Sequence, residues 1–129
     1  MELFKDRNEH VRAWAIQLLM NNFRMAKDGV ALLTEMAEND KSPLVRLYLA
    51  SAAQRVPVNL RAPLLKALLA HDEDVDDPNL PLMYWYATEP VVAADPKIGV
   101  KLLAACKLPK VRQFIPRRMA TGRETSESE

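Results

Sequence analysis

The fold is decided by a stretch that reads Asp40-Lys-Ser-Pro-Leu-Val-Arg-Leu-Tyr-Leu-Ala-Ser-Ala-Ala-Gln-Arg55. A second copy of its pattern lies upstream, and two weaker copies lie downstream. The copies align on the pairs Val11-Arg12, Val45-Arg46, Leu82-Met83 and Val111-Arg112. The pairs start 34, 37 and 29 residues apart. Periods in this range are typical of helical solenoids, in which each unit buries its apolar face against its neighbours.

Two further columns support the repeat. An aromatic residue stands three places after the start of every pair, as Trp14, Tyr48, Trp85 and Phe114. An aspartate stands six places before the second member of the first three pairs, as Asp6, Asp40 and Asp77. The third copy therefore keeps the acid and loses the base, whereas the fourth keeps only its base, Arg112.

Composition and charge describe one globular domain. The 129 residues can bury a core of their own, and the chain is 49% hydrophobic and 27% charged. The net charge is +1, and we interpret the two signs as well mixed along the chain. We therefore expect neither nucleic acid nor an anionic membrane as a partner. No apolar run reaches the roughly 18 residues of a membrane helix, so we expect no membrane insertion.

The cysteine count limits the chemistry of this stretch. The single cysteine, Cys106, excludes an internal disulfide, a zinc site made of cysteines and a c-type haem attachment within it. Its apolar surroundings favour a packing role over a redox or nucleophilic role. With only 3 glycines the chain has little material for phosphate-binding loops. The sequence thus predicts no cofactor and no metal.

Apolar spacing and capping residues predict an all-α protein, an α-α superhelix of about seven or eight helices. In the first helix, Val11, Trp14 and Leu18 belong to the stripe that should be buried. Residues 1–5 resemble the last turn of a helix that begins upstream, so we expect a piece of a larger protein. Residues 1–120 form the predicted repeat domain. The tail, 121–129, has no apolar residue and should be disordered.

An acidic segment, residues 72–78, holds five acids and no base. Such a run could chelate calcium, which takes carboxylate oxygens. The spacing fits no EF-hand loop, because the required glycine and the terminal glutamate are missing. A solvated loop that caps neighbouring helices is the favoured interpretation.

Three successive aromatics, Tyr84, Trp85 and Tyr86, must point in different directions on a helix. Trp85 belongs to the repeat column, so Tyr84 or Tyr86 should reach another surface. That surface could contact a ligand or partner, but packing against a neighbouring helix is the favoured interpretation. Pro90 should break or kink this helix.

Glu89 falls in a column that should face the core, where a carboxylate must be paired or protonated. We predict pairing with an arginine, Arg118 first and Arg55 second. A catalytic acid is the alternative. Because no second carboxylate or histidine stands at a supporting position, we assign no catalytic residue and expect no enzyme. An independent enzyme using Glu89 or His71 would need a pocket that no spacing in the sequence predicts.

The recurring acids and bases could form a ladder. Arginines stacked one per repeat could line a phosphate-binding groove. However, an aspartate at a helix start and an arginine one turn later lie where the next repeat stacks, so charge-assisted hydrogen bonds between repeats are favoured. The predicted ladder consists of Asp6, Arg12, Asp40, Arg46, Asp77 and Arg112.

The aspartate, valine and arginine at this spacing, inside two-helix units, resemble HEAT repeats over about residues 1–120, an armadillo-like helical architecture. The segments 9–16, 42–47 and 80–90 are similar to the HEAT-like part of large multidomain proteins from planctomycete and verrucomicrobial bacteria. Those proteins carry a domain resembling membrane-bound sugar dehydrogenases and a c-type cytochrome domain. The resemblance implies an exported or periplasmic parent protein and a scaffold role for this segment.

The sequence therefore predicts a right-handed α-solenoid that acts as a non-enzymatic scaffold and protein-interaction module. Its partners would be neighbouring domains of a parent chain or another protein. The alternative is a structural spacer of an exported dehydrogenase–cytochrome c protein that takes part in electron transfer. Exposed apolar faces on the first and last helices could also produce dimers of an excised segment.

Overall fold

Helices make up most of the structure, a computed structural model that describes the backbone of residues 2–22 and 27–128 and the side chains of residues 3–21 and 29–120. Its α-helices are α1 (Glu9–Asn22), α2 (Lys27–Asn39), α3 (Pro43–Ala53), α4 (Ala62–Leu69), α5 (Leu80–Ala94), α6 (Pro96–Ala105) and α7 (Pro109–Ser128). Three short 3-10 helices are η1 (Glu2–Lys5), η2 (Val58–Leu60) and η3 (Asp72–Asp74). The described residues include no strand, so the predicted all-α fold class is confirmed.

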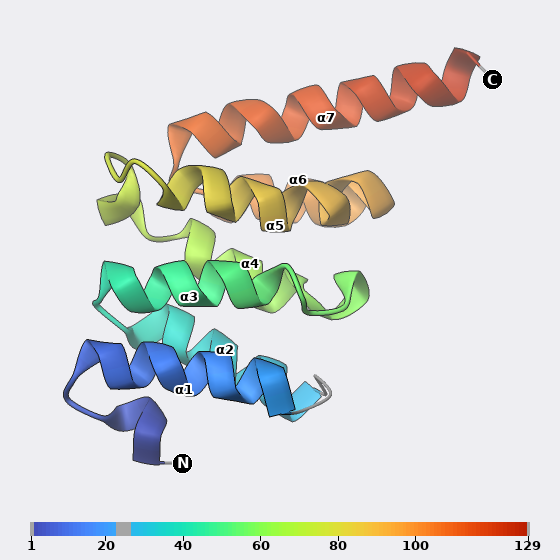
Figure 1. Ribbon diagram of the computed structural model, residues 1–129. Helices are drawn as coiled ribbons and strands as arrows, with labels where there is room; N and C mark the ends of the chain where they lie inside the picture. The colour runs from blue at the N-terminus through green and yellow to red at the C-terminus, as the bar shows by residue number, and fades with distance from the viewer. Residues whose placement is uncertain (1, 23–26, 129) are drawn as a thin grey trace.

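The helices lie in two rows (Figure 1). The odd-numbered helices stack on one another in the order α1, α3, α5, α7, and the even-numbered helices stack behind them in the order α2, α4, α6. One apolar core runs between the rows from Phe4 in η1 to Ile115 in α7. Each helix therefore packs mainly against its nearest neighbours.

Local capping chemistry sets the helix starts. Ser42 Oγ accepts a hydrogen bond from an amide one turn into α3, and Pro43 opens that helix. Asp95 caps α6 in the same way. Helix α4 begins at Ala62 without a side-chain cap, after η2.

The third repeat has a different register from the predicted one. The buried residues Val45, Leu49 and Ala52 of α3 correspond to Leu80, Tyr84 and Ala87 of α5, 35 residues further on. Alignment on Leu82 is thus wrong by two residues, and Leu82 is 41% exposed. The error arose because apolar residues follow one another through this part of α5, so that several registers satisfy the pattern.

The buried stripe of α1 also differs from the prediction. Trp14 is 57% exposed rather than buried. The buried side chains include Ala15, Ile16 and Leu19, which lie on the side of the helix turned toward α3 and the core. Trp14 therefore belongs to the outer face of the odd-numbered row.

Two helices extend beyond their expected ends. Helix α5 continues through Pro90 to Ala94, because the buried side chains of Val91 and Val92 hold its last turns on the core. Helix α7 is assigned through Ser128, over most of the segment 121–129 for which the sequence predicts disorder. The side chains of that segment lie outside the described residues, and its disorder stays a prediction.

Candidate functional site

Two arginine–aspartate pairs join successive units of the odd-numbered row. Arg12 donates from Nε to Asp40 Oδ2 at 2.8 Å and from Nη2 to Asp40 Oδ1 at 3.1 Å. Arg46 binds Asp74 in the same way, at 2.8 Å and 2.6 Å. In both pairs the acid follows the base by 28 residues. The repeated spacing and the repeated two-bond geometry identify one structural device, which we call the Arg–Asp ladder.

Each ladder arginine also binds the loop that precedes its own helix. Arg12 Nη1 donates to the carbonyl of Asp6 at 2.8 Å, and Arg46 Nη1 donates to the carbonyl of Asp40 at 3.1 Å. The guanidinium therefore ties its own helix start to the next unit. The hydrogen bonds that Arg12 donates to Asp40 raise the pKa of Arg12. Burial acts to lower the pKa of Arg46, but the hydrogen bonds and charge of Asp74 raise it overall.

Asp77 is not part of the ladder, contrary to the prediction. Its Oδ1 accepts hydrogen bonds from the amides of Asn79 and Leu80 at 2.8 Å and 2.9 Å, so it caps the start of α5. Asp74 takes its place beside Arg46. The sequence held a signal for this assignment, since Asp74 follows Arg46 by the same 28 residues that separate Asp40 from Arg12.

Tyr84 completes a buried network with the second pair. Its hydroxyl donates to Asp74 Oδ2 at 2.7 Å. The side chains of Arg46 and Asp74 are 1% and 2% exposed, and Tyr84 is buried as well. Burial and the neighbouring carboxylate raise the pKa of Tyr84. Of the three successive aromatics, Tyr84 thus enters the core, while Tyr86 is 51% exposed.

Arg61 is a buried residue that sequence reasoning missed. Its guanidinium donates to the carbonyls of Gln54, Val56 and Ala87 at 3.0, 2.8 and 2.9 Å. These bonds join the end of α3 to the middle of α5. Burial lowers the pKa of Arg61. No side-chain pattern could have predicted this role, because its acceptors are backbone carbonyls, which every residue carries.

Glu89 pairs with Arg118, the first of the two arginines predicted. Arg118 Nε donates to Glu89 Oε1 at 2.7 Å. The two side chains are 33% and 36% exposed, so the pair lies at the edge of the α5–α7 contact rather than in the core. The shifted register explains this position. Nearby, Trp85 packs on Phe114 with ring centroids 5.3 Å apart, which adds a second link between these helices.

Arg112 occupies the ladder position of α7. Its Nη1 donates at 2.9 Å to the carbonyl of Cys106, six residues back, as Nη1 does in the other two ladder arginines. It also donates at 2.9 Å to Leu103. Within the described ranges no carboxylate contacts this guanidinium. Cys106 itself is buried, and burial raises the pKa of its thiol.

The acidic segment stabilises the fold in two ways, through Asp74 in the ladder and Asp77 at the start of α5. No group of three residues suited to hold a metal occurs among the side chains that the structure describes.

His71 lies with Nε2 against the carbonyl of Ala37 and Nδ1 3.2 Å from the carboxylate of Glu73. Although burial acts to raise the pKa of Glu73, its own backbone amide and His71 lower it overall.

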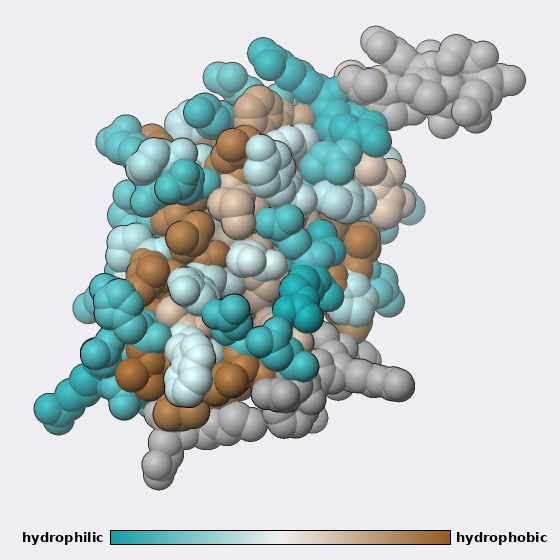
Figure 2. Space-filling model, in the orientation of Figure 1, coloured by the Kyte–Doolittle hydropathy of each residue, from teal (hydrophilic) through white to brown (hydrophobic). Residues whose placement is uncertain are grey.

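The outer face of the odd-numbered helices carries apolar and aromatic side chains in contact with solvent. Figure 2 shows brown and near-white residues on this face, interspersed with hydrophilic ones. Trp14, Leu82 and Tyr86 are its most exposed large apolar residues in the described part. Tyr48 and Met83 lie half-buried beside them.

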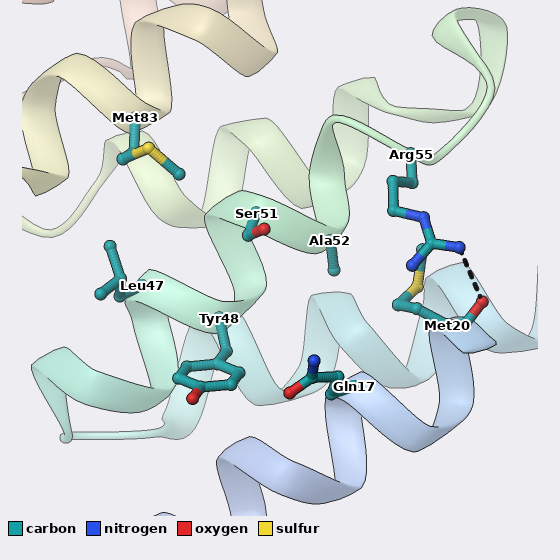
Figure 3. Close-up of a pocket in the computed structure, with 8 residues that line it drawn as sticks. All are labelled: Gln17, Met20, Leu47, Tyr48, Ser51, Ala52, Arg55 and Met83. Atoms are coloured by element: carbon teal, nitrogen blue, oxygen red, sulfur yellow. Dashed lines mark hydrogen bonds between the residues drawn. The ribbon is translucent and has the colours of Figure 1, made fainter.

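A hollow of about 370 Å³ opens on this face where α1, α3 and α5 meet (Figure 3). At one edge Arg55 donates to the carbonyl of Met20 at 3.2 Å, which ties α3 to the end of α1. The rest of the wall combines apolar and neutral polar groups. The lining consists of Gln17, Met20, Leu47, Tyr48, Ser51, Ala52, Arg55 and Met83.

Comparison of the chain with protein-family models, curated proteins and solved structures found no match. The resemblance to HEAT-like segments of multidomain bacterial proteins therefore stays a prediction. In the described part of the chain, no helix combines the length and the apolar character needed to cross a membrane.

Proposed function

We propose that this chain is a HEAT-like α-solenoid that acts as a non-enzymatic scaffold and protein-interaction module. The observation that carries the proposal is the Arg–Asp ladder. The same two-bond contact, at the same 28-residue spacing, joins unit one to unit two and unit two to unit three. A stack that repeats its contacts in this way supports a rigid surface assembled from successive units.

The buried polar side chains support the same role. Arg46, Asp74 and Tyr84 hold units together, and Arg61 holds α3 against α5. Among the described residues, every buried side-chain nitrogen and oxygen has a hydrogen-bond partner. These groups are used to fix the stacking of the helices, which is what a scaffold requires.

The binding surface in this proposal is the outer face of the odd-numbered helices. Exposed aromatic side chains are enriched where proteins meet, because they bury a large apolar area at low entropy cost. Trp14 on α1 and Tyr86 on α5 provide such side chains on two helices that also line the hollow beside Tyr48. The partner would be a protein segment with apolar side chains that fill the hollow.

The test is photo-crosslinking of partners in the source cells, with a photoreactive residue in place of Ser51 in the hollow. The double variant Trp14→Ala, Tyr86→Ala should lose the crosslinked species. Val100→Ala is the matched control, because Val100 is 55% exposed but lies on α6 in the other row. The proposed face is wrong if the crosslinked species persists in the double variant, or if Val100→Ala removes it equally.

The alternative is a structural spacer between the dehydrogenase and cytochrome domains of an exported protein. The continuous core and the ladder favour it, because a spacer must hold its ends in fixed geometry. The coding region on both sides of this segment tests it. An export signal upstream and Cys-x-x-Cys-His downstream would support the spacer, and stop codons at both ends would exclude it.

A further inference from the structure

Arg112 has the local geometry of a ladder arginine, but no carboxylate binds it among the described residues. It is the fourth residue of α7, as Arg46 is the fourth residue of α3 and Arg12 of α1. Its Nη1 is occupied by the carbonyl six residues back, as in the other two. In those two arginines, Nε and Nη2 clamp a carboxylate of the next unit. In Arg112, Nε and Nη2 contact no acceptor within the described residues, and the side chain is exposed.

The sequence on both sides of Arg112 carries charges of one sign. From residue 96 to residue 123 the sequence holds eight basic residues and no acidic one, so the even charge of the whole chain hides a basic end. Lys107 and Lys110 are exposed beside Arg112. Figure 2 shows hydrophilic residues along the upper edge of the view, where α7 lies. No large apolar side chain is exposed on the described part of α7, where the sequence predicts an exposed apolar face.

We propose that this end of α7, formed by Lys107, Lys110 and Arg112, docks an acidic protein partner, and that one partner carboxylate clamps Arg112 as Asp40 clamps Arg12. The ladder geometry specifies the partner's contact group. An aspartate just before a helix presents both oxygens while a following amide orients one of them, as the amide of Ser42 does for Asp40 at 3.0 Å. The partner is therefore an acidic helical segment with an aspartate at its start. This inference extends the proposed scaffold by a second surface, separate from the hollow beside Tyr48.

The proposal is tested with the full chain and a peptide of six aspartates as the probe. The Nε–Hε signal of Arg112, observed by nitrogen-15 NMR, should shift as the peptide binds at low salt. Arg112→Glu should weaken binding about tenfold, the effect of losing one charge-assisted contact. Arg112→Lys should weaken it about threefold, since lysine keeps the charge but not the two-bond fork. Lys110→Glu, a second exposed variant, should weaken it by a similar factor to Arg112→Lys.

Arg7→Glu is the matched control, because Arg7 is an exposed cation at the other end of the stack. It should leave the affinity unchanged. Equal losses in Arg7→Glu and Arg112→Glu would overturn the proposal in favour of nonspecific charge. It would also be overturned if single-stranded DNA of equal charge bound more tightly through Arg112. Self-association removed by Arg112→Glu would assign the surface to a second copy instead. The crosslinking test at Ser51 is independent of all these results.

Discussion

Asp74→Asn should be among the most damaging conservative substitutions in this chain. The change keeps the shape of the side chain but removes the charge that compensates Arg46, which is 1% exposed. Three groups donate to the Asp74 carboxylate, namely Nε and Nη2 of Arg46 and the hydroxyl of Tyr84. In asparagine one of the two acceptor oxygens becomes an amide nitrogen, which would face at least one of these donors. Breaking a buried pair at one partner costs about 3–5 kcal/mol. With about 2.1 cal/mol/K of unfolding entropy per residue, the expected loss in Tm for 129 residues is roughly 10–20 °C.

Two more exposed pairs provide stability losses with which the loss in Asp74→Asn can be compared. Arg12 and Asp40 have side chains that are 18% and 8% exposed, so Asp40→Asn should cost about 1–3 kcal/mol. Arg118 and Glu89 are 33% and 36% exposed, and Glu89→Gln should cost about 0–1 kcal/mol. Urea unfolding at pH 7, followed by circular dichroism and by tryptophan fluorescence, measures all three.

The reasoning is refuted if Asp74→Asn costs no more than Glu89→Gln. A triple variant checks the cause of the loss. Arg46→Met, Asp74→Leu and Tyr84→Phe together remove the charges and the hydroxyl, and buried pairs replaced by apolar groups are often nearly neutral in stability. The triple variant should therefore be more stable than Asp74→Asn alone.

Two further predictions concern buried titratable groups. Burial raises the folded-state pKa of Cys106 above its usual value of 9.0, and it also raises the pKa of Tyr84. Both groups therefore contribute fully to stability below about pH 9, and their contribution is lost as the pH rises. Urea titrations from about pH 8 to 11 should show this decline, and a less steep one in Cys106→Ala and in Tyr84→Phe; parallel slopes in all three proteins would contradict it. Arg61→Met should lose about 2–4 kcal/mol of unfolding free energy because three carbonyls lose their donor, whereas the exposed Arg55→Met should lose about 1 kcal/mol or less. Similar losses in both arginine variants would show that the carbonyl contacts of Arg61 matter little.

The sequence predicted the helical class and the register of the first two units, because their capping residues and their Val-Arg pairs indicate the same alignment. It also indicated the pairing of Glu89 with Arg118, although not its exposure. The third unit was placed wrongly because Pro81 replaces the ladder arginine there and the neighbouring residues are nearly all apolar. Without the base, only the 28-residue spacing from Arg46 to Asp74 identifies the acid.

The outer face and Arg61 were harder to predict for physical reasons. A helical stripe of apolar residues is wider than the surface a helix can bury, so spacing alone placed Trp14 inside. The structure turns Trp14 outward and fills the core with smaller side chains such as Ala15. Arg61 binds only backbone carbonyls of segments before and after it in the chain, and such contacts follow from tertiary packing.

The central claim, that successive units stack through one repeated contact, is tested most directly by adding a unit. A second copy of residues 40–73 inserted after residue 73 keeps both arginine-to-aspartate spacings at 28, because the copy begins with Asp40 where Asp74 would stand. We predict unchanged helicity per residue, one cooperative transition and an m-value that rises roughly with the added length. A copy of residues 40–70 at the same place shortens the spacing and should destabilise the fold. Equal unfolding of the two insertion proteins would contradict the account.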